Sequence, residues 1–190
     1  MALQGRHALT ALWRMVLVAG FAMVFLPFPD LDQQLLWLLH HRSILTHSVL
    51  PGVVLVFVGR RLGAAPVAGA LLGLSVHLAC DALSRPLGYG QIWLPAPWKI
   101  PLGEWSRWWL LGNAVLSYLM ALTIARFTLP KGWGMPFVIT LSALLGFYYG
   151  TVNEKAALST LVAVALPVAN AGVVIWLSRR HRKRLRALKV

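Results

Sequence analysis

The sequence has little charge, few acidic residues and almost no cysteine. Of its 190 residues, 12% are charged and 58% are hydrophobic, whereas an average soluble domain has about 25% charged residues. The lone cysteine, Cys80, excludes an intrachain disulfide and any metal cluster built from several cysteines. Apolar surface on this scale requires lipid, and we therefore predict an integral membrane protein.

Long apolar runs recur along the chain and divide it into helices. Runs near 20 residues match the thickness of a bilayer, so we predict an all-α fold, one polytopic transmembrane bundle over residues 1–178. Glycines and alanines in the third run would let it approach its neighbours closely, and we expect it to be central. Six helices are expected, the second and fifth of them short: Ala8–Phe28, Val49–Val58, Ala64–Leu83, Trp108–Phe127, Phe137–Tyr149 and Ala156–Leu177.

The basic residues predict the orientation of this bundle. The net charge is +13, and seven of the eighteen Lys and Arg residues form a basic tail over residues 179–190. A tail of this kind after an apolar helix is typical of the cytoplasmic side, where it contacts anionic lipid. Six crossings then place both termini in the cytoplasm. The expected partners are membrane lipids, and no nucleic acid is expected.

Histidines and acidic residues gather in the first half of the chain. On the predicted topology they occupy the exit of the first helix, the start of the second and the outer end of the third, which share one membrane face. The orientation does not depend on them, so their convergence is independent support for a single site. Seven of the eleven such residues belong to this group: Asp30, Asp32, His40, His41, His47, His77 and Asp81.

The spacing of these residues suits a metal site. His77 and Asp81 are four residues apart on a helix, which places both side chains on one face. Imidazole with carboxylate suits zinc, manganese or iron better than calcium. Ionisable groups within a transmembrane helix are costly, and they are functional by default. Asp30 and Asp32 add two carboxylates, and the segment 41–48 adds two imidazoles and a guanidinium.

Each part of this group also has a structural interpretation. Asp30 could be only a helix-end residue, and His40 only a polar neighbour. Arg42 could simply pair with Asp30 or Asp32. The tryptophans in and just after the loop 84–106 are explained by an aromatic belt at the membrane surface. The combination of motifs is more specific than any one of them.

In chain order, the residues between Pro29 and Pro101 form one combined pattern. It consists of Pro29-Asp30-Leu31-Asp32, His41-Arg42, Thr46-His47-Ser48, His77-x-x-x-Asp81, Gly88 and Trp93-Leu94-Pro95. This pattern resembles the YdjM-type bacterial membrane-bound metal-dependent hydrolases. That family is distantly similar to the zinc phospholipase C and P1 nuclease superfamily, whose helical sites bind several zinc ions and cleave phosphate esters. The resemblance implies a multi-pass hydrolase of the bacterial inner membrane.

The resemblance also implies roles for the residues of the site. Asp30 would act as the general base, with Asp32 as the alternative for this role and Asp30 itself as a further candidate ligand. Arg42 would hold a phosphate oxygen as charge develops on it. The family pattern has an early histidine, for which His7 is the one candidate, and a further histidine where this chain has Gln33. The implied metal is zinc, with manganese or iron as alternatives, and its implied ligands are Asp32, His41, His47, His77 and Asp81.

Two other classes of function remain open. A transporter of metal ions or protons needs polar residues that continue to the other face, but beyond Ser75 the third helix is apolar or small. A non-catalytic membrane adaptor would act through the basic tail, so truncation of the tail would abolish its function but spare a hydrolase. We expect a metal-dependent hydrolase that acts on a phosphate ester, or another ester, of an amphiphilic substrate at the extracytoplasmic face.

Overall fold

The computed structural model describes residues 2–83, 90–153 and 180. Every regular element among them is helical, so the predicted all-α fold is confirmed for this part of the chain. The predicted sixth helix, Gly88 and all of the basic tail except Arg180 lie outside the described residues. The elements are α1 (Ala2–Phe25), η1 (Phe28–Leu35), α2 (Leu50–Val58), η2 (Gly59–Arg61), α3 (Ala64–Leu83), α4 (Trp105–Thr128) and α5 (Gly134–Val152).

Four stretches are long and apolar enough to cross a membrane. They are Leu9–Leu35 in α1 and η1, Ala64–Ala82 in α3, Trp105–Thr128 in α4 and Gly134–Val152 in α5. α5 begins earlier than predicted, because Pro136 lies in its first turn, where a missing N–H is tolerated. α2 is short, as predicted, and its nine residues extend over about 14 Å, less than half of a bilayer's hydrocarbon core.

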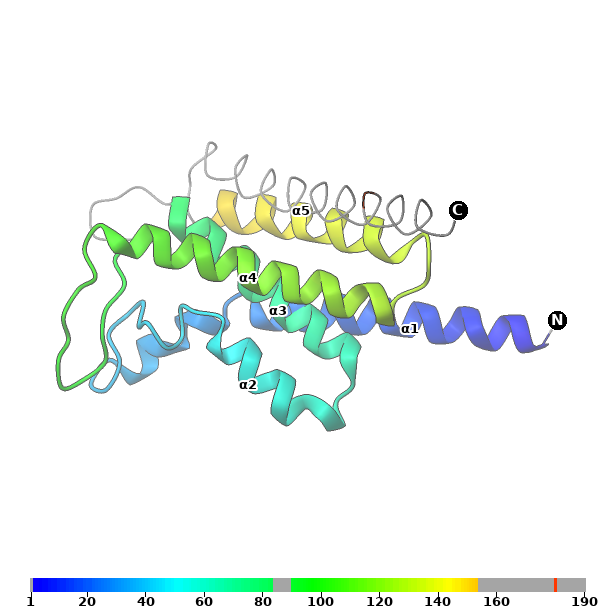
Figure 1. Cartoon of the computed structure of the whole chain (residues 1–190), viewed down its shortest axis with the longest axis horizontal. Coiled ribbons are helices and arrows are strands. Elements are labelled where there is room, and N and C mark those ends of the chain that lie inside the picture. The colour runs from blue at the N-terminus through cyan, green and yellow to red at the C-terminus, as the bar shows by residue number, and fades with distance from the viewer. Residues whose placement is uncertain (1, 84–89, 154–179, 181–190) are drawn as a thin grey trace.

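α3 is the central helix of the bundle. In its membrane-length window 94% of the residues are buried, against 17–39% in the other three. In Figure 1, α1, α4 and α5 run along the long axis around α3, and α2 lies to one side of them. The predicted central place of the third helix is therefore confirmed, and α3 is the scaffold from which its own His77 and Asp81 project.

Two glycines let α3 lie directly against α1. A Cβ added at Gly69 would overlap the carbonyl oxygen of Val18, and one added at Gly73 would overlap that of Ala22. A backbone oxygen cannot move aside as a flexible side chain can, so the two helices would have to separate. Gly73 precedes His77 by one helical turn on the same face, and this close packing therefore also sets the position of that histidine.

We expect Gly73→Ala to lower the free energy of unfolding by about 1–3 kcal/mol, the usual range for overpacking a tightly packed core. Gly112→Ala on α4 is the matched control, because a Cβ there meets no atom within 4 Å. The control should be neutral or slightly stabilising, since alanine favours a helix. Thermal unfolding in detergent micelles measures both variants, and equal loss of stability in the two would contradict the packing argument.

Candidate metal centre

The predicted site residues meet at one end of the bundle. η1 contributes Asp30 and Asp32, the segment before α2 contributes His41 to His47, and the last turns of α3 contribute His77 and Asp81. Figure 1 shows η1 and this segment beside the loop that leads into α4, where α1 and α3 also end. The three parts of the sequence thus share one end of the molecule, as predicted from the topology.

Four side-chain atoms approach one another in this group. His47 Nε2 lies 3.3 Å from His77 Nε2, and each of these nitrogens lies 3.9 Å from Asp30 Oδ1. Asp81 Oδ2 lies 3.3 Å from His47 Nε2 and 3.5 Å from His77 Nε2. Asp30, His47 and His77 each offer one ligand atom, and these three atoms lie within 4.8 Å of one another. The group could therefore hold a metal ion.

The distances and the chemistry of these atoms both fit a metal ion. A tetrahedral zinc ion with bonds of about 2.0–2.1 Å separates its ligand atoms by roughly 3.3 Å, close to the shortest separations in the group. Two imidazole nitrogens with carboxylate oxygens form a donor set that suits zinc, and also manganese or iron.

The charges of the group also favour a cation. Asp32 and Asp81 are almost completely buried, and 31% of the Asp30 side chain is exposed. Three carboxylates and the one guanidinium of Arg42 leave an excess of two negative charges when the histidines are neutral. Buried charge of one sign is costly unless it is compensated. A divalent cation at the ligand atoms would balance the described part of the group.

Asp32 contacts the Nδ1 side of the His47 ring, whereas the Nε2 atom of that ring faces His77. Its Oδ2 accepts hydrogen bonds from Thr46 Oγ1 at 2.7 Å and from the backbone N–H of Ser43 at 2.9 Å, and it lies 3.2 Å from His47 Nδ1. Asp32 Oδ1 lies 3.2 Å from His41 Nδ1. A carboxylate on one imidazole nitrogen fixes the tautomer and leaves the other nitrogen available to a metal. This position favours an orienting role for Asp32 over the predicted direct ligation.

His47 is held in strongly negative surroundings. Burial alone would lower the pKa of its imidazole, but hydrogen bonds to Asp32 and Asp81 and the charges of these carboxylates outweigh burial and raise the pKa above its usual value. Metal binding requires the neutral imidazole, so a metal ion and a proton compete for this side chain. The surroundings that favour the proton also favour a metal cation in its place.

The structure pairs Arg42 with Asp81, a partner that spacing along the chain does not suggest. Arg42 Nε donates to Asp81 Oδ2 at 2.8 Å and Nη2 donates to Oδ1 at 3.3 Å, a two-point contact between buried groups. Arg42 has a φ of 60°, in the left-handed region. Trp93 fixes this backbone, because its N–H donates to the Arg42 carbonyl and its own carbonyl accepts from Ile44. The predicted contact of Arg42 with a phosphate stays a prediction.

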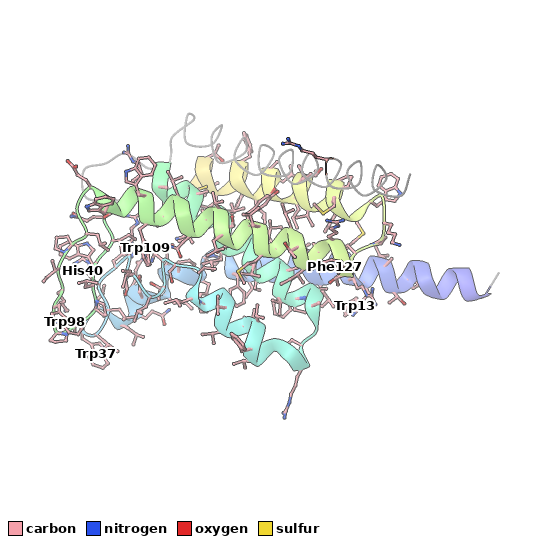
Figure 2. The ribbon with its side chains drawn as sticks, in the orientation of Figure 1. Trp13, Trp37, His40, Trp98, Trp109 and Phe127 are labelled. Carbon is pink, nitrogen blue, oxygen red and sulfur yellow. The ribbon has the colours of Figure 1, made fainter. Side chains whose placement is uncertain are left out.

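Two side chains of α4 satisfy backbone groups just before the start of α2. Trp109 Nε1 donates to the carbonyl of His47 at 2.9 Å, and Asn113 Oδ1 accepts from the N–H of Val49 at 2.9 Å. Figure 2 shows Trp109 between α4 and the segment that leads into α2. Backbone groups in apolar surroundings need such partners. Trp109, expected in an aromatic belt, thus holds the backbone of His47, and Asn113 holds the backbone two residues later.

His40 and His7 stand apart from the ligand atoms. The ring of His40 stacks on that of Trp93 with 4.1 Å between centroids, as expected of a polar neighbour. His7 lies in the first turns of α1, and about 27 Å of helix separates its backbone from Phe25 at the end that leads to the site. The helix therefore places the backbone of His7 at the opposite end of the bundle.

Tyr149 of α5 is the residue of the site that the sequence analysis missed. Its hydroxyl donates to Asp30 Oδ2 at 3.1 Å, and its ring lies 5.0 Å from the ring of His77. A tyrosine in an apolar run carries no distinctive pattern. The available signal is the pair Gly146 and Gly150, four residues apart and both buried, since this spacing is typical of a helix face that approaches another helix closely.

Comparison with known protein families, with curated proteins and with solved structures gave no match. The resemblance to the YdjM-type hydrolases therefore stays a prediction from the sequence. The chemistry of the site has to be inferred from its own geometry, and that geometry describes a group of two buried imidazoles and neighbouring carboxylates which could bind a metal ion.

Proposed function

We propose that this chain is a membrane-embedded, metal-dependent hydrolase, which acts on a phosphate ester or another ester of an amphiphilic substrate at the extracytoplasmic face. The observation that carries the proposal is the convergence of Asp30, His47 and His77 at one end of an apolar helical bundle. Zinc is the ion that suits the donor set best, and manganese and iron follow.

Four residues of the site are the proposed metal ligands. Asp30, His47 and His77 would hold the ion, and Asp81 Oδ2 is a fourth donor, 3.3–3.5 Å from the two imidazole nitrogens. When bound, the ion supplies a Lewis acid that acidifies water and polarises the ester oxygen. Because Asp30 Oδ1 faces the imidazoles, we assign Asp30 to metal binding and not to the predicted role of general base.

His41 is a better candidate than Asp30 for the role of general base. Its side chain is 35% exposed, so it can exchange protons with water, and its Nδ1 lies 3.2 Å from the buried Asp32. An imidazole that is oriented by a carboxylate is the usual arrangement of a general base. Its ring centroid lies 6.0 Å from that of His47, which places it beside the proposed metal ligands.

The surroundings of the site suit an amphiphile. A hollow of about 610 Å³ begins at the end of α3, and its polar lining includes Glu104 and Arg107. Apolar side chains are exposed at the same end, among them Trp37 and Trp98, which Figure 2 labels there. A hollow with charged groups on its wall, beside exposed apolar side chains, fits a substrate with a polar head group and a hydrocarbon chain. Arg107 would attract a phosphate.

The core favours a closed site over a transport path. The main apolar cluster combines residues of α1, α3, α4 and α5, with Val18, Ala22, Leu71, Leu72, Val76 and Leu122 among its members. The polar side chains buried among the same helices include Ser75, Ser117 and Ser142, which are uncharged. The apolar cluster lies between the site and the opposite end of the described bundle. Transport would require ionisable groups along that distance. A hydrolase needs access from one side alone.

Hydrolysis by the full chain in detergent tests the proposal. We expect zinc-loaded protein to cleave a phosphate or carboxylic ester of a lipid, to lose this activity to a chelator and to recover it with zinc. His47→Ala should lower the rate at least ~100-fold, because metal catalysis contributes several kcal/mol. His40→Ala is the matched control and should keep the rate. A metal-loaded chain that cleaves neither phosphate monoesters, phosphate diesters nor carboxylic esters of lipids would contradict the proposal.

A further inference from the structure

We propose that Tyr149 is a positioning residue of the metal centre: its hydroxyl holds Asp30 Oδ2 and so directs Oδ1 towards His47 and His77. This inference rests on the proposed function, because it assigns Asp30 to metal binding. The contact joins α5 to η1, which are 119 residues apart at this point in the sequence. The phenol therefore ties the last described helix to the ligand group.

Asp30 is the proposed ligand that most needs such a contact. It lies in η1, a 3-10 helix, and its side chain is 31% exposed. Asp81 is fixed at two points by Arg42. For Asp30, the hydroxyl of Tyr149 is the hydrogen-bond donor to the side chain within the described residues. A carboxylate with one fixed oxygen loses much of its rotational freedom, so the entropy cost of metal binding falls.

Tyr149 is itself held firmly. The residue is 4% exposed, and its ring packs against the imidazole of His77, 5.0 Å away between centroids. Gly146 lies about one turn before it, Gly150 follows it directly, and both are buried; the carbonyl of Gly146 lies 4.0 Å from Cys80 Sγ on α3. Small residues at these positions let α5 approach α3 closely. One side chain thus touches two of the proposed ligands.

The size of the expected effect follows from the chemistry of metal ligands. Groups that orient a ligand without touching the metal commonly change metal affinity by about 10–100-fold when they are removed. We therefore expect Tyr149→Phe, which removes the hydroxyl and keeps the ring, to weaken zinc binding by about 10–100-fold. The visible absorption of cobalt(II) in the site should change in shape or intensity, because it reports the arrangement of the ligands around the ion.

Two other tyrosines provide matched controls. Tyr118→Phe removes a buried hydroxyl in the middle of the bundle, where it contacts Ser142 Oγ at 3.3 Å. Tyr148→Phe removes an exposed hydroxyl on the neighbouring residue of α5. Zinc affinity should be unchanged in both, even if Tyr118→Phe lowers the thermal stability as much as Tyr149→Phe does. Loss of affinity in all three would show a general structural effect and overturn the inference.

A double-variant cycle tests whether Tyr149 affects zinc affinity through Asp30. In an Asp30→Ala background, Tyr149→Phe should change zinc affinity no further, since the carboxylate that it positions is gone. If the parent binds zinc and Tyr149→Phe binds it equally well with the same cobalt spectrum, the inference fails and the proposed function stands. If the parent binds neither zinc nor cobalt, the metal centre fails first, and the positioning role fails with it.

Discussion

Replacing His47 and His77 together with alanine is expected to abolish tight zinc binding. The two Nε2 atoms, 3.3 Å apart, are two of the three ligand atoms that converge in the structure. Carboxylates alone would remain, and oxygen ligands without imidazole suit calcium or magnesium better than zinc. Loss of one orienting group already weakens binding about 10–100-fold, so loss of two ligands should weaken it at least ~1,000-fold.

Elemental analysis after dialysis against limiting zinc measures this effect directly. The parent should retain close to stoichiometric metal and the double variant almost none. His40→Ala is the control, because His40 stacks on Trp93 away from the ligand atoms. Zinc at 100 times its Kd should also stabilise the parent by about 2.7 kcal/mol and leave the double variant unchanged. Equal metal content in the parent and the double variant would refute the metal centre.

Removal of Arg42 is expected to produce the largest loss of stability. Its guanidinium contacts Asp81 at 2.8 and 3.3 Å in a buried position, and it is the one permanent positive charge described among three carboxylates. Removing one partner of a buried ion pair commonly costs about 3–5 kcal/mol, because the other charge stays buried. We expect a loss of this size for Arg42→Ala in metal-free protein.

The backbone of residue 42 allows charge and strain to be separated. A φ of 60° is unfavourable for alanine and easy for glycine. Arg42→Gly should therefore be less destabilised than Arg42→Ala, although both lack the charge. Saturating zinc should recover part of the loss in both, since its two positive charges replace the missing one. Arg107→Ala, at an exposed position of α4, is the control. Unchanged unfolding temperatures in both residue-42 variants would contradict the argument.

The sequence predicts well what depends on neighbouring residues. The helices follow from apolar runs of bilayer length, and the pairing of His77 with Asp81 follows from a spacing of one helical turn. The meeting of η1, the segment before α2 and α3 also follows, because alternating directions return every second helix end to the same face. These conclusions need only the local pattern and the order of the helices along the chain.

Other features of the site depend on contacts that no spacing encodes. In the sequence, nothing distinguishes Asp32 from a metal ligand, and its contacts with Thr46 and His47 emerge only in three dimensions. Tyr149 meets Asp30 across 119 residues of sequence. In the sequence Asn113 is an isolated polar residue of an apolar helix, and only the folded chain brings the N–H of Val49 to its Oδ1. Three-dimensional packing decides each of these cases.

The unequal exposure of the site residues has a consequence for kinetics. Asp30 and His41 are about one-third exposed, whereas His47, His77 and Asp81 are almost completely enclosed. Among the described residues of the site, Asp30 and His41 are therefore the side chains that an arriving ion or water molecule would meet first. A substrate seated against these two side chains would cover the exposed side of the group and slow the departure of the ion, so the lifetime of the loaded centre would depend on whether substrate is bound as well as on bond strength.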